Sequence, residues 1–321
     1  MKNSISKPPL ISIAIPAYKS TFLTAAVKSV LNQTFQDFEL IIINDGAQKS
    51  IDQVIKDFPQ KNIRYYKKQR KAGENLNPVE TWNLCLKKAQ GKFLLLFADD
   101  DLLEPQYLES MVQLAFKYPE VTLFSCRFNI ITQSGAIIDQ SPIIPEFESG
   151  LEYIWNHLNE KRQIKCVNYL YHRESLLQKG GFFELPMAWG SDVLTNYALA
   201  LDNGIASTNK ELCSWRRSME NITNNSFFTQ KLEALLDFEP KAMELINNYE
   251  RSDKNSKFIF NIKKKLPVRL SEQKLVLLIK TSQLRSRYRL YFSTYFKNRI
   301  TYSLKIRAYF NVLLARIKSK T

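Results

Sequence analysis

Residues 93–101 read Phe-Leu-Leu-Leu-Phe-Ala-Asp-Asp-Asp, a run of apolar residues that leads directly into three carboxylates. Residues 93–97 are too few for a helix of ordinary length and do not alternate with polar residues, so they predict a strand buried on both faces of a sheet. Ligands of open α/β sheets bind outside the carboxyl ends of the strands. At that edge, the oxygen atoms of Asp99, Asp100 and Asp101 suit Mg²⁺ or Mn²⁺. Taken alone, the three acids equally suit a loop that caps the next helix.

Strands and helices are predicted to alternate around this stretch. Strand-like apolar runs occur at 10–16, 38–43, 63–66 and 121–128, and helix-like segments at 22–31, 51–58, 78–89 and 105–118. This alternation predicts βαβ units, and therefore an α/β fold with a mostly parallel, Rossmann-like sheet flanked by helices. After residue 129 the pattern changes to a predicted hairpin at 130–138, helices at 151–158 and 192–201, and strands at 166–172 and 212–217.

The charge of the chain is unevenly distributed. The 321 residues carry a net charge of +15, but residues 251–321 hold 19 Lys and Arg against two acids, which leaves the first 250 residues at −2. Within 284–317, Tyr, Phe and Leu are interleaved with Lys and Arg, a pattern typical of helices that lie on an anionic membrane surface. The alternative is a helical subdomain that packs on the body or on a partner chain, and nothing in the body favours nucleic acid as a partner. We therefore predict two domains, a catalytic one at 1–228 and a helical, basic one at 229–321.

The start of the chain, its apolar runs and its cysteines indicate the cellular compartment of the protein. The start of the chain lacks the apolar core of a signal peptide, and no apolar run reaches the roughly 20 residues of a membrane span. The four cysteines are far apart and include no CxxC pair, which favours reduced thiols over a zinc site or disulfides. We expect a cytoplasmic protein, peripheral at the inner face of the plasma membrane.

Several common sites are absent from the sequence. It contains no GxGxxG, P-loop, GxSxG or HExxH motif. What remains is a set of turns at strand ends, namely 16–18, 44–46 and 99–101, which we expect to lie side by side at one edge of the sheet. The first turn would hold a base and ribose, Asp45 would accept a hydrogen bond from the base, and the acids would hold a divalent ion against a diphosphate. Alternatively, Asp45 only forms the turn in Asn-Asp-Gly.

Four segments in order carry a resemblance to a known family. They are ISIAIPAY at 11–18, ELIIINDG at 39–46, AQGKFLLLFADDDLLEP at 89–105, and GGFFE at 180–184 followed by WGSD at 189–192. This order resembles the family-two glycosyltransferases with the GT-A fold, over about residues 10 to 225.

The resemblance implies inverting transfer of a sugar from a nucleotide sugar, usually with Mg²⁺ or Mn²⁺. It implies that the nucleotide contacts are Pro16, Ala17, Tyr18, Asp45 and Asn83. It also implies that Asp99 and Asp101, with Asp100 between them, form the DxD-type site for metal and diphosphate, and that Asp192 is the general base for the acceptor. The donor we expect is a UDP-sugar, and the acceptor a surface glycan or a lipid-linked glycan.

The sequence departs from the family pattern at several positions. Ala98 stands where many relatives have the first Asp of D-x-D-D, Asn44 replaces a frequent Asp, and Ser191 replaces an acid before Asp192. The Q-x-x-R-W motif of processive synthases is absent, which favours addition of a single sugar.

Two rival functions remain open. A sugar nucleotidyltransferase also uses an α/β sheet and carboxylates, but the loop after the first strand lacks the glycines expected of one. A catalytically inactive membrane-binding scaffold is compatible with Ala98 and Ser191. For Arg216 and Arg217 we predict ordinary solvated charges. The alternative is that these arginines reach a diphosphate.

Overall fold

The computed structural model describes residues 7–46, 48–70, 77–218, 228–250 and 256–283. The aromatic and basic pattern predicted at 284–317 lies outside these residues. The chain divides into two compact units, one formed by 1–184 and 191–218, the other by 185–190 and 219–321. Residues 185–190, which lie inside the first of the two predicted domains (1–228 and 229–321), group with the second unit.

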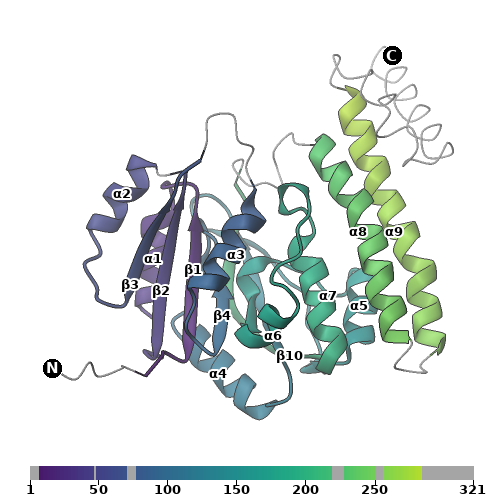
Figure 1. Ribbon diagram of the computed structural model, residues 1–321, viewed down its shortest axis with the longest axis horizontal. Coiled ribbons are helices and arrows are strands. Elements are labelled where there is room, and N and C mark those ends of the chain that lie inside the picture. Colours follow the sequence, from purple (N-terminus) through teal and green to yellow (C-terminus); the bar gives the residue numbers. More distant parts are fainter. Residues whose placement is uncertain (1–6, 47, 71–76, 219–227, 251–255, 284–321) are drawn as a thin grey trace. The chain divides into compact units, whose positions relative to one another are not determined.

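The first unit is built on a mixed ten-stranded sheet (Figure 1). Its main path runs β3-β2-β1-β4-β9-β6-β10-β5, while β7 pairs with β6 and β8 with β10. The longer pairings, among β3, β2, β1 and β4 and between β6 and β10, are parallel, whereas β9 is antiparallel to both of its neighbours. The predicted fold class is confirmed. The strands are β1 (Ile11–Ala17), β2 (Phe38–Asp45), β3 (Ile63–Lys68), β4 (Phe93–Leu96), β5 (Leu102–Leu103), β6 (Leu123–Ile131), β7 (Ile137–Gln140), β8 (Phe147–Glu148), β9 (Tyr169–His172) and β10 (Ile205–Arg216).

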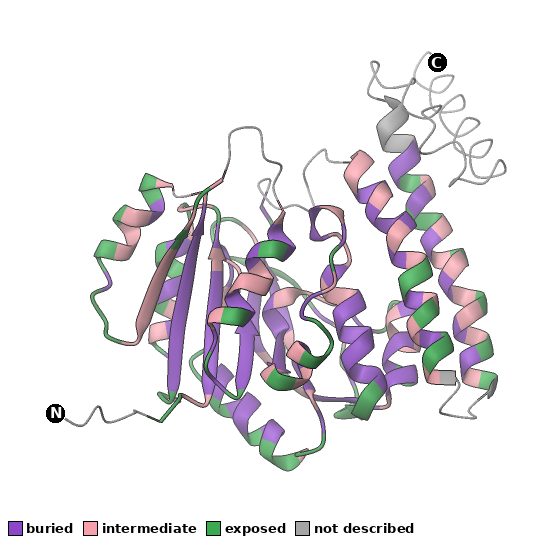
Figure 2. Ribbon diagram, in the orientation of Figure 1, coloured by how far each residue is buried: buried purple, intermediate pink, exposed green. Residues whose placement is uncertain are grey.

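The two strands β2 and β4, which lead to Asp45 and to the acids at 99–101, are buried throughout. All four residues of β4 and all eight of β2 are buried, and Figure 2 shows these strands in the colour of buried residues. β4 lies between β1 and β9, as the uninterrupted apolar run at 93–97 predicted. Burial of such aliphatic side chains contributes roughly 1.5–3 kcal/mol each, so the strand that leads into the acids is firmly held.

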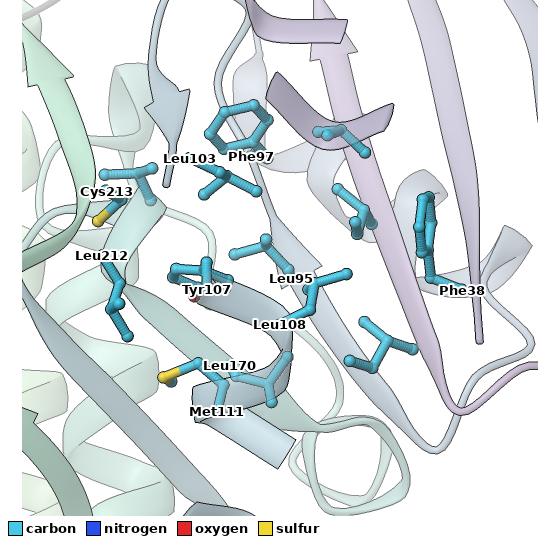
Figure 3. Packing of buried hydrophobic residues seen from close by; sticks show 14 of the residues in the cluster. Phe38, Leu95, Phe97, Leu103, Tyr107, Leu108, Met111, Leu170, Leu212 and Cys213 are labelled. Atoms are coloured by element: carbon cyan, nitrogen blue, oxygen red, sulfur yellow. The ribbon is translucent and has the colours of Figure 1, made fainter. Parts of the chain in front are cut away.

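Helices cover this sheet. They are α1 (Leu23–Leu31), α2 (Lys49–Lys56), α3 (Pro78–Lys88), α4 (Tyr107–Lys117), α5 (Gly150–Leu158), α6 (Arg173–Gln178) and α7 (Ser191–Asn203). α3 begins where the Asn77 side chain accepts the N–H of Glu80, with Pro78 in the first turn. α4 packs its buried face, which includes Tyr107, Leu108 and Met111, into the core cluster that also contains Leu95 of β4 (Figure 3).

The structure differs from the sequence prediction in several elements. β10 begins at Ile205, seven residues before the predicted start, because residues 207–211 are polar and conceal the strand pattern. Residues 166–168, predicted as strand, form a 3₁₀ turn (η1, Cys166–Asn168) before β9. The short strands β5 and β8 and the six-residue helix α6 were not predicted, since elements of that length carry little periodicity.

The second unit contains two long helices. α8 (Phe228–Glu250) and α9 (Ser256–Gln283) pack against each other and bury Leu235, Ile246, Ile259 and Leu266. A 3₁₀ turn at Pro186–Ala188 (η2) packs against α8. No helix within the described residues is both long and apolar enough to cross a membrane.

Candidate functional site

The acid loop, residues 99–101 after β4, is joined to the loop after β1. One carboxylate oxygen of Asp99, Oδ2, accepts the backbone N–H groups of Tyr18 and Lys19, each at 2.7 Å. The Lys19 ammonium forms an ion pair with Asp100 Oδ2 at 2.9 Å. The predicted proximity of these two loops follows from the parallel pairing of β1 with β4, which brings their carboxyl ends to the same edge.

Arg216, the last residue of β10, holds the other side of the acid loop. Its backbone N–H donates to Asp101 Oδ1 at 2.8 Å, and its Nε donates to the carbonyl oxygen of Asp100 at 2.7 Å. Its Nη1 donates to the carbonyl oxygens of Thr132 and Gln133, at 3.1 and 2.8 Å. The side chain is buried, so the prediction of a solvated charge is wrong for Arg216. It is right for Arg217, which is exposed.

The carboxylates of the acid loop are held in an unfavourable environment. Burial, and next the charge of Asp100, raise the pKa of Asp99 to about 6. The same two causes raise the pKa of Asp101 well above its ordinary value. Such crowding of desolvated carboxylates is relieved when a cation joins them.

The donor set of the acid loop fits a hard divalent cation. The hydrogen bonds to Asp99 fall on Oδ2 and the one to Asp101 falls on Oδ1, so each carboxylate has a second oxygen to offer. In the part of the chain that the structure describes, however, no group of three or more His, Cys, Asp or Glu side chains is arranged to hold a metal by itself. A metal held here would therefore take its remaining ligands from water or phosphate, as Mg²⁺ commonly does.

The raised pKa of Asp99 has a measurable consequence for stability. Between the ordinary value of 3.8 and about 6 the folded protein binds a proton more tightly than the unfolded chain, so this group's contribution to folding falls as pH rises through that window. Asp99→Asn removes the charge and keeps an oxygen for the two backbone N–H groups. With a chelator present, we expect this variant to be more stable than the native protein at pH 7.5 by about 3 kcal/mol, and no more stable near pH 4.

Urea denaturation at the two pH values measures this effect. Asp202→Asn is the matched control, because Asp202 is exposed and pairs with Lys179 on the surface. A native protein as stable as Asp99→Asn at pH 7.5 would contradict the stated cause of the pKa shift.

Asp45, at the end of β2, is buried and held by three side chains. Arg70 contacts both carboxylate oxygens, from Nε at 3.0 Å and from Nη2 at 2.9 Å. The Thr81 hydroxyl donates to Oδ2 at 2.8 Å, and the Lys68 ammonium lies 3.7 Å from Oδ1. The Arg70 guanidinium also lies 5.0 Å from the ring centre of Tyr18. Asp45 and Tyr18, both predicted nucleotide contacts, are thus brought together through an arginine that sequence reasoning missed.

The other predicted nucleotide contacts lie near this pair. Pro16 and Ala17 are the last residues of β1, paired with Ile43 and Asn44 of β2. Asn83, on α3, uses both ends of its amide on the backbone of Phe182: it accepts the N–H at 2.8 Å and donates to the carbonyl oxygen at 3.1 Å. These bonds connect α3 to the turn at Gly181, where a Cβ would lie 2.4 Å from Asn83 Oδ1.

Asp192 stands in the first turn of α7. Its Oδ1 accepts the backbone N–H of Val193 at 2.9 Å, and Cys166 Sγ donates to its Oδ2 at 3.5 Å. Burial raises the pKa of Asp192, which the hydrogen bonds partly oppose.

The charges of Asp192 and of the acid loop both act on Lys165. Burial lowers the pKa of Lys165, while the negative charges of Asp192 and Asp101 oppose that shift. Both carboxylates therefore act on one ammonium group, although they are 91 positions apart in the chain. Sequence reasoning missed Lys165 and Cys166, because neither belongs to a motif and the 3₁₀ turn that positions them was predicted as strand.

Comparison with known proteins identifies the family. A sequence model of glycosyl transferase family 2 matches residues 12–181, more than half of the chain. The chain belongs to glycosyl transferase family 2. The matched region contains β1, β2 and the acid loop, and it ends before Asp192.

The relatives of this family 2 member differ in the share of their own length that aligns with this chain. An uncharacterized glycosyltransferase of Rickettsia bellii is 35% identical over 142 residues, which are 43% of this chain but only 20% of that protein. The Escherichia coli protein named UDP-Glc:alpha-D-GlcNAc-diphosphoundecaprenol beta-1,3-glucosyltransferase WfgD is 24% identical over 221 residues, covering 68% of this chain and 81% of WfgD.

Solved structures share the fold. S. aureus TarS 1–349 aligns with a TM-score of 0.61 at 16% identity, over 94% of this chain and 78% of that one. The mannosyltransferase PcManGT from Pyrobaculum calidifontis, solved with GDP-Man and Mn²⁺, aligns with a TM-score of 0.54 at 14% identity, over 96% and 88% of the two chains. Likeness at these identities establishes the GT-A-like fold and nothing more.

Proposed function

We propose that this family 2 member transfers one sugar, with inversion, from a UDP-sugar to a hydroxyl of a lipid-linked or surface-glycan acceptor. The observation that supports the proposal is a chain of contacts from the candidate base to the acid loop: Cys166 donates to Asp192, the preceding Lys165 lies against Trp215, and the next residue, Arg216, donates to Asp101. A single displacement needs both, an acidic end for the leaving diphosphate and a base for the attacking hydroxyl.

The donor is proposed to bind across the ends of β1, β2 and β4. Tyr18 and Asp45 would contact the base, with Arg70 between them, and the backbone of Pro16 and Ala17 would face the ribose. A uridine nucleotide is supported by the name of WfgD and by a structure of TarS solved with UDP-GlcNAc. The paired hydrogen bonds of Asn83 with Phe182 favour a supporting role for Asn83, in which it holds the Gly181 turn.

Asp99 and Asp101 would hold Mg²⁺ or Mn²⁺, with Asp100 and Lys19 beside them. The ion would supply Lewis-acid stabilisation of the charge that develops on the diphosphate. The presence of Mn²⁺ in the PcManGT structure supports this part of the proposal.

Asp192 is proposed as the general base. The acceptor hydroxyl oxygen forms a bond to the anomeric carbon, the bond from that carbon to the diphosphate oxygen breaks, and the hydroxyl proton passes to the Asp192 carboxylate. A carboxylate with a raised pKa accepts this proton more readily than an ordinary Asp. The hydrogen bonds from Val193 and Cys166 hold the carboxylate in one orientation.

Acceptor-dependent nucleotide release tests this function. The protein is incubated with UDP-Glc, UDP-GlcNAc or GDP-Man, with Mn²⁺ or with EDTA, and with or without GlcNAc-diphosphoundecaprenol. We expect release of UDP from a UDP-sugar only when both the metal and an acceptor are present. Release of pyrophosphate from a nucleoside triphosphate and a sugar phosphate would instead identify a nucleotidyltransferase, and no turnover with any donor would favour an inactive scaffold.

The protein is also proposed to bind an anionic membrane surface, at the inner face of the plasma membrane. On α9, the exposed residues Lys257, Phe260, Lys264, Val268, Glu272 and Val276 follow one another at helical spacing along one face, and the acid Glu272 pairs with Arg269. The combination of exposed apolar and basic residues is that of helices which lie on anionic lipid. Co-sedimentation of the protein with vesicles containing phosphatidylglycerol, and not with neutral phosphatidylcholine vesicles, tests this part; equal binding to both would contradict it.

A further inference from the structure

Lys165 is positioned by contacts of both its backbone and its side chain. Its backbone N–H donates to Asn168 Oδ1 at 3.1 Å, and the Asn168 amide in turn donates to the carbonyl oxygen of Cys126 in β6 at 3.0 Å. Its ammonium lies 3.9 Å from the ring centre of Trp215. Trp215 immediately precedes Arg216, which is bonded to the acid loop. The side chain is thus positioned by contacts on two sides.

The electrostatic surroundings of Lys165 are unusual for a structural lysine. Among the described residues it interacts through space with Asp192 and Asp101, with no hydrogen bond to either, and more weakly with Cys166 and with the cation Arg217. A lysine that only neutralised one acid would be expected to form a direct ion pair with it, as Lys19 does with Asp100. The indole face covers one side of the ammonium, so its N–H donors are directed to the remaining sides.

We propose that Lys165, held over Trp215, is an anion-binding residue that contacts a diphosphate. The inference rests on the proposed function and extends it, since the diphosphate is the anion that would lie against the acid loop, with the sugar between it and the base. Two sources share this chemistry: the diphosphate of the sugar donor, and the diphosphate next to the sugar of a lipid-linked acceptor. A compact ammonium suits either one, because lysine binds phosphate oxygens as a point charge.

Binding of inorganic pyrophosphate, measured by calorimetry with Mg²⁺ at the same concentration for every variant, tests the proposal without requiring turnover. The full-length protein is compared with Lys165→Met, which keeps most of the unbranched stem without the charge, and with Lys165→Arg, which keeps the charge. We expect Lys165→Met to bind pyrophosphate about tenfold more weakly or worse, and Lys165→Arg to remain within about threefold of the native protein. Lys179→Met is the matched control, because Lys179 pairs with Asp202 at the surface of the same unit.

The result that overturns the proposal is equal pyrophosphate affinity in Lys165→Met and the native protein, or no binding to either. A lower melting temperature of Lys165→Met with unchanged pyrophosphate affinity would show that the lysine is structural. Failure of the proposed transfer reaction is read separately, from the nucleotide-release experiment, because pyrophosphate binding does not depend on catalysis.

Two further measurements identify the source of the diphosphate. If it belongs to the donor, Lys165→Met weakens binding of UDP by about the same factor as pyrophosphate. If it belongs to the acceptor, UDP affinity is unchanged, while KM rises for a short prenyl-diphosphate GlcNAc and stays constant for an uncharged alkyl GlcNAc. A KM that rises equally for both acceptors, with UDP affinity unchanged, would contradict contact with a diphosphate.

Discussion

Asp192→Asn is expected to lower kcat by about 10²–10⁴-fold, the range typical of general-base catalysis. The amide keeps the size of the side chain and can still accept the N–H of Val193, but it cannot take a proton from the acceptor hydroxyl. Binding of UDP should be unchanged, because the acid loop and Asp45 are untouched. Steady-state rates of nucleotide release and calorimetric binding of UDP measure the two quantities.

The pH dependence of kcat in the native protein and in Asp192→Asn provides a second test of the same role. Burial raises the pKa of Asp192, so the activity of the native protein should begin to fall, as pH is lowered, at a higher pH than an ordinary aspartate would give. That acid limb should disappear from the residual activity of Asp192→Asn. Asp202→Asn, on the same helix but exposed, should behave as the native protein. An unchanged kcat in Asp192→Asn would remove Asp192 from the mechanism.

Arg216→Met is expected to lower the free energy of unfolding by about 3 kcal/mol. Methionine fills a similar volume, but the carbonyl oxygens of Asp100 and Gln133 lose their arginine donor, and that of Thr132 keeps only the N–H of Gly135. A buried acceptor left without a partner, as at Asp100, costs about 1–3 kcal/mol, and the loss of the arginine charge beside the raised-pKa carboxylate of Asp101 adds to this. Urea denaturation of the purified variant measures the loss.

The neighbouring residue provides the control for this prediction. Arg217→Met removes the same charge from an exposed position, where substitutions usually change stability by no more than about 0.5 kcal/mol. Equal stability of Arg216→Met and Arg217→Met would mean that the buried contacts of Arg216 contribute little. We also expect weaker UDP binding in Arg216→Met, because the acid loop loses one of its anchors.

The central sheet could be predicted because its signals are local. The run at 93–97 is continuous and apolar, and β1, β2 and β4 all lie within one or two residues of their predicted limits. Parallel pairing then dictates that the residues following these strands meet at one edge, which is why Tyr18 and Asp99 could be expected near each other. In contrast, the polar first half of β10 and the turn at 166–168 carry no local signal, since their conformation is set by pairing with β6 and by the side chain of Asn168.

The amino-acid sequence by itself determined the fold class and which carboxylates are candidates for the site, because a buried strand followed by acids is encoded in adjacent residues. Only the tertiary structure decided which cations accompany them. Arg70, Lys165 and Arg216 stand in ordinary contexts along the chain and come to the candidate site through strand order and burial. From the sequence, Arg216 and Arg217 received the same prediction. At the end of β10, however, Arg216 is buried against the acid loop and Arg217 is exposed to solvent. Which of two adjacent charges is desolvated depends on the surface that packs against the strand, and that surface comes from residues about a hundred positions away.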